Sequence, residues 1–247
     1  MRLVAWNANY NNQKRSFVDT VELLSALHAD VLVLSETALP EAPEAKSDTV
    51  HIVGTSNPGL AVVTVGREYR LARLSPTKSS PDLSCLLRIT GPPPTTPFGL
   101  AAVWPVDRDN RHPYHDTLMQ ALECHRDELC RPPAIMAGDL NSSTRVKDQA
   151  KSHSLFVDAA REVGLESVYH HHAGEDHGAE LLNTYVHGKK NPVPFHIDYC
   201  FVSRALLPAA TITIPQSPFW AARSDHYPLI LDIPDSAMRE ADASKQN

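Results

Sequence analysis

Closely spaced cysteines are absent from this sequence. Its four cysteines are scattered along the chain without a C-x-x-C pair, as Cys85, Cys124, Cys130 and Cys200. Cysteine-based zinc sites and disulfide frameworks depend on cysteines at short, regular spacings. The sequence therefore excludes a zinc finger or a disulfide scaffold as its organising element, and a reducing cytoplasm fits it best.

Excess positive charge and long hydrophobic runs are also lacking. Asp and Glu number 29 against 23 for Lys and Arg, which gives a formal net charge of −6. Proteins that coat nucleic acid nonspecifically are usually basic, so a phosphate-bearing substrate must be held here locally or through metal ions. No apolar leader opens the chain, and no apolar run reaches membrane-spanning length. We expect a soluble cytoplasmic protein with no membrane partner and no obligate protein partner.

Glycine is scarce, with 10 residues against 20 prolines, which indicates stiff loops between regular elements. Helical spacing of apolar residues predicts helices that begin at Ser16, cover 113–130 and cover 154–163. Apolar runs predict strands at 2–6, 30–35, 60–65, 69–74, 84–90, 98–104, 134–137, 196–203, 210–214 and 227–233. These elements fall into two similar batches, which predicts an α/β protein: a four-layer α/β sandwich of two packed mixed β-sheets flanked by helices.

The domain organisation follows from the lack of a linker. No flexible segment divides the two batches of strands and helices, so residues 1–234 are expected to form one domain. The last residues, 235–247, are polar and rich in Ala, Ser and Lys. We predict that they form a flexible C-terminal tail.

The stretch Ala134–Asn141, A-I-M-A-G-D-L-N, contains the first candidate site. A short buried strand is followed by Asp139 and Asn141, whose spacing puts both side chains on one face of an extended backbone. A carboxylate and an amide at the end of a buried strand are costly to desolvate unless a cation or ligand satisfies them. The alternative is an ordinary Asx-type turn, because G-D-x-N is also good turn chemistry.

Other predicted strands end in the same way, with polar side chains at Asn7, Glu36, Asp198, Asp225 and His226. If these ends share one rim, they form a nest of oxygen ligands with one imidazole. Oxygen donors without thiolates select a hard divalent cation, Mg²⁺ or Mn²⁺. A hard cation beside a carboxylate and a histidine is suited to the hydrolysis of a phosphate ester.

In chain order, the motifs that carry these residues are W-N (6–7), L-S-E-T (34–37), G-D-L-N (138–141), H-I-D-Y (196–199) and S-D-H (224–226). Together they resemble the endonuclease/exonuclease/phosphatase superfamily, which includes DNase I-like nucleases and AP endonucleases. The resemblance covers nearly the whole chain, and 153–199 looks most like small bacterial members. It implies a DNase I-like fold and a catalytic domain that hydrolyses phosphate esters.

The resemblance also implies a metal site. Glu36 would be the principal ligand of Mg²⁺ or Mn²⁺, with Asn7 beside it. Asp225 would be a ligand of a second metal, or a group that supports the first. No cysteine or histidine is needed in this set, which agrees with the hard cation expected from the strand ends.

Catalytic roles are implied for the remaining motif residues. Asp139 would orient or deprotonate the attacking water, and Asn141 would donate to the phosphoryl oxygen. His226 would contact the scissile phosphate as acid, base or electrostatic stabiliser, with Asp198 on its far ring nitrogen. Whether Asp139 or His226 is the base stays open.

The substrate side departs from the AP endonuclease pattern. Many AP endonucleases have an acid where this chain has Asn9, and a catalytic tyrosine where this chain reads V-W-P-V-D. This weakens the case for cleavage at abasic sites but not for hydrolysis. Trp104 either stacks on a base or belongs to the core. His196 either touches the substrate or has a local structural role.

Cations nevertheless gather in the loops expected to surround the site, at Arg108, Arg111, Arg145, Lys147, Lys189, Lys190 and Arg223. This favours a polyanionic substrate, and a nuclease acting on DNA or RNA is the leading hypothesis. A hydrolase of a small or lipid-linked phosphate ester is the alternative, and a catalytically silent binding module is a third. The run His170–His172 with His177 is interpreted as a polar loop, not as a metal site.

Overall fold

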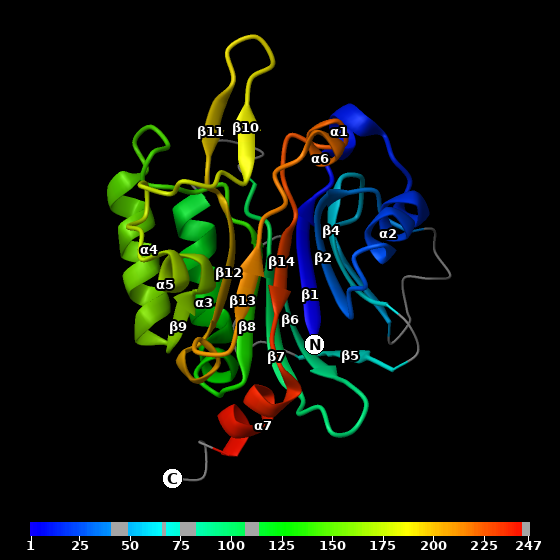
Figure 1. The fold of residues 1–247 in the computed structure, drawn as a ribbon, viewed down its shortest axis with the longest axis vertical. Helices are drawn as coiled ribbons and strands as arrows, with labels where there is room; N and C mark the ends of the chain where they lie inside the picture. Colours follow the sequence, from blue (N-terminus) through cyan, green and yellow to red (C-terminus); the bar gives the residue numbers. More distant parts are fainter. Residues whose placement is uncertain (41–48, 66–67, 75–82, 107–113, 244–247) are drawn as a thin grey trace.

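Two six-stranded β-sheets stacked face to face form the centre of the molecule (Figure 1). The computed structural model describes residues 1–40, 49–65, 68–74, 83–106 and 114–243. The first sheet has the order β13-β14-β1-β2-β4-β3, with bounds Thr211–Thr213, Leu229–Asp232, Arg2–Asn7, Val31–Thr37, Gly59–Thr64 and Val50–Val53. The second has the order β5-β6-β7-β8-β12-β9, with bounds Arg70–Arg73, Ser84–Thr90, Phe98–Val103, Ala134–Asp139, Asp198–Ser203 and Leu165–Ser167.

Both sheets are mixed. In the first, β1 runs parallel to β2, and in the second, β7 runs parallel to β8, while the other pairings are antiparallel. The inner faces bury a common core to which the central strands contribute Leu3, Val33, Leu100 and Ala137. These strands are apolar on both faces because each sheet is covered on both sides. The predicted fold class is confirmed.

Helices cover the outer faces, as expected for a four-layer sandwich (Figure 1). Two long helices, α3 and α4, lie over the second sheet, and the shorter α2 lies over the first. The helix bounds are Tyr10–Gln13 (α1), Phe17–Ser25 (α2), Tyr114–Leu129 (α3), Ala150–Glu162 (α4), Val168–Ala173 (α5), Pro218–Ala221 (α6) and Asp235–Ala243 (α7), with a 3₁₀ turn η2 at Arg204–Leu206. The predicted cap of α2 is present: Ser16 Oγ accepts a hydrogen bond from the Asp19 N–H at 3.1 Å.

The predicted flexible tail is wrong for most of its length. Residues Asp235–Ala243 form α7, which buries Ala237, Met238 and Ala241 against the core between the sheets. The apolar positions recur at a spacing of three and four, which is the spacing of one helical face. The residues around them are polar or charged, so composition alone does not reveal this apolar face. Residues 244–247 lie outside the described part of the chain.

A small hairpin stands apart from both sheets. Its strands β10 (Tyr185–His187) and β11 (Val193–Phe195) pair antiparallel and project from the end of the molecule opposite α7 (Figure 1). The turn between them carries the exposed residues Lys189 and Lys190. In the part of the chain that the structure describes, every helix is too short or too polar to cross a lipid bilayer.

Candidate active site

The polar strand ends converge on one open pocket at the edge where the two sheets meet, on the side of the projecting hairpin. The pocket has a volume of about 480 Å³. It is lined by Asn7, Asn9, Asn11, Asn12, Glu36, Asn57, Pro58, Trp104, Val106, Tyr114, Asp139, Asn141, Tyr185, Asp225 and His226. These residues come from both sheets and from both ends of the sequence, so tertiary structure brings together most of the predicted catalytic and metal-binding residues.

Asp139 is the buried acid at the centre of this pocket. Its Oδ2 accepts a hydrogen bond from Asn7 Nδ2 at 2.9 Å, and its Oδ1 accepts one from the backbone N–H of Asn141 at 2.9 Å. Asn141 has a left-handed backbone, with φ of 48°, and its Nδ2 lies 3.1 Å from the carbonyl oxygen of Pro105. The predicted pair therefore shares one face, and Asn7 from the other sheet joins it.

Gly138 makes the placement of Asp139 possible. Its φ is +144°, and a Cβ at this position would lie 2.0 Å from the carbonyl oxygen of Val103 in the neighbouring strand. Only glycine accepts this backbone conformation and this close approach. The G-D-L-N motif therefore carries a steric requirement as well as two functional side chains.

Glu36 reaches the pocket through a local distortion of β2. The register between β2 and β4 shifts between Leu34 and Thr37, and Glu36 has a positive φ of 44° within this bulge. A bulge re-aims a side chain that would otherwise follow the alternation of the strand. Glu36 Oε1 accepts a hydrogen bond from Asn11 Nδ2 at 3.0 Å, at the mouth of the pocket.

His226 and Asp198 form a buried pair behind Asp139. The distance from His226 Nδ1 to Asp198 Oδ2 is 2.9 Å, and the two residues are 5% and 2% exposed. The backbone of His226 is held by Trp6, whose Nε1 donates to the His226 carbonyl oxygen at 3.0 Å, and by Ser224. The resemblance predicted this pairing, and the hydrogen bond orients the ring with Nε2 as the nitrogen left for the pocket.

The charges of this group are coupled. Burial and then the nearby Asp198 carboxylate raise the pKa of Asp139, against the lowering effects of His226 and Asn7. Burial lowers the pKa of His226, but the carboxylates of Asp198, Asp139 and Asp225 together raise it, to about 9. His226 is therefore a cationic imidazolium at neutral pH, next to an acid that ionises with difficulty.

Sequence reasoning missed several residues of the pocket. Asn9 Nδ2 donates to Asp225 Oδ1 at 2.7 Å, and Asn9 Oδ1 accepts from Asn12 Nδ2 at 2.7 Å. The ring of Tyr185 lies 4.5 Å from that of His226 between centroids. The run N-A-N-Y-N-N directly after β1 was the available signal for the asparagines. No sequence motif around Tyr185 indicates a role in the pocket. It is brought there by a backbone β-bridge to His226.

The donor set of the pocket fits a hard divalent cation. Glu36 and Asp225 offer carboxylates, and Asn7 offers an amide oxygen. Asn7 Oδ1 accepts one hydrogen bond, from the Asn9 N–H, and keeps a second lone pair for a metal ion. No thiol lines the pocket among the described residues. Polar atoms of Asp139, Asp198 and His226 also lie within 4.8 Å of one another. Because His226 is hydrogen-bonded to Asp198 and cationic, this second group is better suited to handling a proton than to holding a cation.

The predicted substrate-binding residues are dispersed. Trp104 lines the pocket but is 4% exposed and belongs to the core between the sheets. Arg145 and Lys147 are exposed and do not line the pocket. The guanidinium of Arg223 lies 3.6 Å from the centroid of the Phe219 ring. Arg108 and Arg111 lie outside the described residues.

His196 does not reach the pocket. It is 2% exposed, and its Nδ1 is hydrogen-bonded to the Leu182 carbonyl oxygen at 2.8 Å. Its ring lies among Tyr169, His170 and Tyr199. Strand alternation would put residues 196 and 198 on the same side, but His196 precedes β12, which begins at Asp198, and its ring packs on the side of Tyr199 instead. The predicted contact with substrate is therefore not made in this structure.

The same fold occurs in solved structures of nucleases. The 3'-5' exonuclease NExo from Neisseria meningitidis superposes with a TM-score of 0.66 at 19% identity, covering 94% of this chain and 99% of that chain. The AP endonuclease from Archaeoglobus fulgidus gives a TM-score of 0.65 at 17% identity, with 94% and 99% covered. The endonuclease domain of TRAS1, a telomere-specific non-LTR retrotransposon, gives 0.66 at 13% identity, with 94% and 97% covered. At these identities the likeness shows the DNase I-like fold alone.

Sequence comparison identifies the family. No match was found among curated proteins. The sequence model of the Endonuclease/Exonuclease/phosphatase family matches residues 4–226, a span that includes all five motifs and every strand end that reaches the pocket. The chain therefore belongs to the endonuclease/exonuclease/phosphatase family.

Proposed function

We propose that this chain is a divalent-metal-dependent phosphodiesterase that hydrolyses DNA or RNA. The observation that carries the proposal is that one pocket combines the buried Asp139 carboxylate, the His226 imidazole hydrogen-bonded to Asp198, and an outer set of oxygen donors. Family membership supports a phosphoric ester hydrolase. Nucleases are among the structural neighbours, and one of them, a 3' phosphatase from Neisseria, is bound to a product DNA hairpin.

The metal is assigned to the outer donors. Glu36, Asn7 and Asp225 would hold Mg²⁺ or Mn²⁺, because they are oxygen donors at the open side of the pocket. A divalent cation bound there would neutralise phosphate charge and polarise the scissile group. Asn9, Asn11 and Asn12 hold these carboxylates in place through amide hydrogen bonds, directly or through one another.

The inner residues are assigned to proton handling. Asp139 orients the attacking water and takes its proton, since burial raises the pKa of its carboxyl and makes it a stronger base. His226 presents a positive Nε2–H to the phosphate or to the leaving oxygen, and Asp198 holds its ring. Asn141 lines the pocket, and its Nδ2, which donates to the Pro105 carbonyl oxygen and to Asp139 Oδ2, would exchange one of these bonds for one to a phosphoryl oxygen.

Binding of a strand would use the surfaces around the pocket. Tyr185 and Trp104 offer aromatic rings, although only an edge of Trp104 is accessible. The exposed Lys189 and Lys190 lie on the hairpin that begins at Tyr185 and can meet phosphates beyond the scissile one. Aromatic stacking with backbone cations is the usual way of holding single strands.

One observation favours a second candidate. No Lys or Arg lines the pocket within the described part of the chain. The pocket therefore offers no cation for phosphates beyond the scissile one, which suits a small or lipid-linked phosphate ester. A strand would depend on cations outside the pocket, and its binding should fall steeply with salt. A small ester, with one phosphate, should show a weak dependence on salt.

A substrate panel tests the proposal. Plasmid, single-stranded DNA, RNA and a soluble phosphodiester are incubated with the protein, with Mg²⁺ or Mn²⁺ and with EDTA. We expect cleavage of a nucleic acid that EDTA abolishes and that His226→Ala reduces by at least about 100-fold. Efficient cleavage of only the soluble ester would support the second candidate, and full activity in EDTA would contradict metal dependence.

A further inference from the structure

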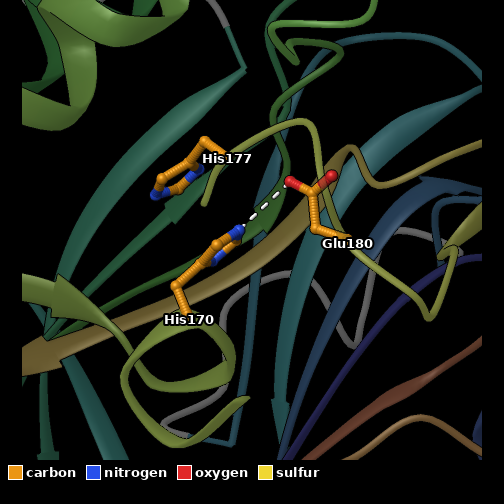
Figure 2. Close-up of side chains that lie close together, drawn as sticks. All are labelled: His170, His177 and Glu180. Carbon is orange, nitrogen blue, oxygen red and sulfur yellow. Dashed lines mark hydrogen bonds and ion pairs between the residues drawn. The ribbon is translucent and has the colours of Figure 1, made fainter. Parts of the chain in front are cut away.

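A second polar cluster lies behind the catalytic strand β12, away from the pocket. Figure 2 shows the imidazoles of His170 and His177 lying one over the other, with the Glu180 carboxylate directed at His170. His170 Nε2 lies 3.1 Å from Glu180 Oε1, and the two rings stack with centroids 3.6 Å apart. One ligand atom from each of the three residues lies within 4.8 Å of the others. The run His170–His172 lies on helix α5, so the sequence-based interpretation of this run as a polar loop is wrong.

The geometry is fixed by the local backbone and by neighbouring side chains. His170 lies on α5, and its Nδ1 is held by Ser167 Oγ at 2.8 Å, which turns Nε2 toward Glu180. The loop that follows α5 is held by Thr144, whose Oγ1 donates to the His177 carbonyl oxygen at 2.7 Å. The Gly178 N–H donates to Glu180 Oε1 at 2.9 Å.

Two further histidines, His153 and His196, lie next to the cluster. His153 is fully buried, and its Nε2 lies 3.1 Å from His177 Nδ1. His196 is 2% exposed, and its ring centroid lies 5.5 Å from that of His170. Within the described residues, His196 Nε2 and Glu180 Oε2 are buried polar atoms without a hydrogen-bond partner. Buried polar atoms of this kind are costly unless a ligand satisfies them.

The chemistry of the cluster is that of a zinc-type donor set. His170 and His177 offer imidazole nitrogens and Glu180 offers a carboxylate oxygen, and these atoms lie within 4.8 Å of one another.

We propose that His170, His177 and Glu180 bind a divalent transition-metal ion of the zinc type, with His196 as a further ligand. The three ligand atoms lie within 4.8 Å of one another, within reach of a single ion. Because the His170 and His177 rings are stacked and only 12° from parallel, one of them must turn on binding so that both nitrogen lone pairs face the ion. A pocket of about 260 Å³, lined by His170, His177, Glu175 and Asp176 among others, leads from solvent to the cluster. Glu166, Glu175 and Asp176 line this pocket with Arg161, and this excess of acidic side chains favours the entry of a cation.

The ion would be structural, because the site consists of protein ligands from α5, the loop after it and the segment before β12. That loop ends at Thr184, whose Oγ1 accepts the backbone N–H groups of Ile197 and Asp198, both at 3.0 Å. Metal binding would thus stabilise the loop that supports the catalytic strand. This proposal does not rest on the proposed reaction, since its donors are nitrogen-rich and separate from the oxygen donors of the pocket.

The test is metal binding by the whole chain after removal of metal with a chelator. Zn²⁺ is titrated against a chromophoric chelator, and thermal unfolding is measured with and without the ion. We expect one tight equivalent and a raised Tm in the wild type. His177→Ala and Glu180→Gln should weaken binding by more than about 100-fold, because each removes a direct ligand. His171→Ala, an exposed histidine of the same helix, should bind as the wild type does.

Two further measurements separate the possible outcomes. Glu36→Gln, in the catalytic pocket, should retain the tight Zn²⁺ site, and Co²⁺ should give tetrahedral ligand-field absorption in the wild type but not in Glu180→Gln. Circular dichroism checks that each variant is folded. Absence of saturable Zn²⁺ binding in the wild type would show that the cluster is only a hydrogen-bond network. Equal affinity in wild type, His177→Ala and Glu180→Gln would place the ion elsewhere. Either result overturns the proposal.

Discussion

His226 Nδ1 lies 2.9 Å from Asp198 Oδ2, and both residues are buried although they are far apart in the sequence. His226 follows the last turn before β14, and Asp198 begins β12. The pair therefore depends on the stacking of the two sheets. It also gives the cationic imidazole a fixed orientation toward the pocket.

The first prediction separates the roles of this pair. His226→Ala should lower kcat by at least about 100-fold, because it removes the positive donor at the phosphate. Asp198→Asn should lower kcat by less, since an amide can still accept a hydrogen bond from Nδ1–H and hold the ring. Steady-state kinetics on the substrate identified by the panel, with both variants folded, check this. A larger defect in Asp198→Asn would contradict the division of roles.

The second prediction concerns the backbone at Gly138. Gly138→Ala should destabilise the protein by about 3 kcal/mol, because a Cβ would lie 2.0 Å from the Val103 carbonyl oxygen at an unfavourable φ. Gly174→Ala is the matched control: its φ is also positive, but nothing lies within 4 Å of the added Cβ, so only about 1 kcal/mol is expected. Urea denaturation measures both. Equal losses would show that the close approach has no energetic consequence.

The third prediction concerns stability against pH. His125 is 1% exposed, and burial lowers its pKa from 6.5 to about 4. As pH falls below 6.5, the unfolded chain binds a proton that the folded chain binds only near pH 4. His125 therefore lowers stability progressively over this window, by up to about 3 kcal/mol, and has no such effect above pH 6.5.

His125→Leu should remove this contribution. The difference in unfolding free energy between variant and wild type should shift in favour of the variant as pH falls from 7 to 4. His171→Ala, at an exposed position, should keep the pH dependence of the wild type. Denaturation curves at a series of pH values provide the measurement, and parallel curves for wild type and His125→Leu would refute the prediction.

The fourth prediction concerns the hairpin. Lys189→Ala and Lys190→Ala should each raise KM for a nucleic acid with little change in kcat, and should reduce the salt slope of binding by about 1. Arg239→Ala is the control, because Arg239 is exposed on α7 at the opposite end of the molecule (Figure 1). Kinetics and binding over a series of salt concentrations test this. Unchanged KM in both lysine variants would remove the hairpin from the substrate-binding surface.

Local sequence patterns were sufficient for the fold class and for most of the predicted residues that line the pocket. Buried strands such as β2 and β8 are read from continuous apolar runs, and the side chain that follows each run is visible in sequence as Glu36 or Asp139. A strand end followed by polar side chains is a local property, so one sequence can show it. The short helix α7 was missed because its apolar face consists mainly of alanine.

The features that sequence could not supply depend on contacts between distant segments. Nothing in the order of residues shows that Asn7 and Asp139 lie 2.9 Å apart, that a bulge turns Glu36 into the pocket, or that Tyr185 covers His226. His196 faces the second cluster and not the pocket, a choice set by the packing around β12.

The sequence by itself determined which chemical groups this protein has and the strand ends on which most of the proposed catalytic groups lie. Only the tertiary structure decided which of those groups meet. It brought Asp139, Asp198 and His226 into one site, and His170, His177 and Glu180 into another. The physical reason is that hydrophobic patterning acts within each element, whereas the distances between polar groups are set by how the finished sheets, loops and helices pack against one another.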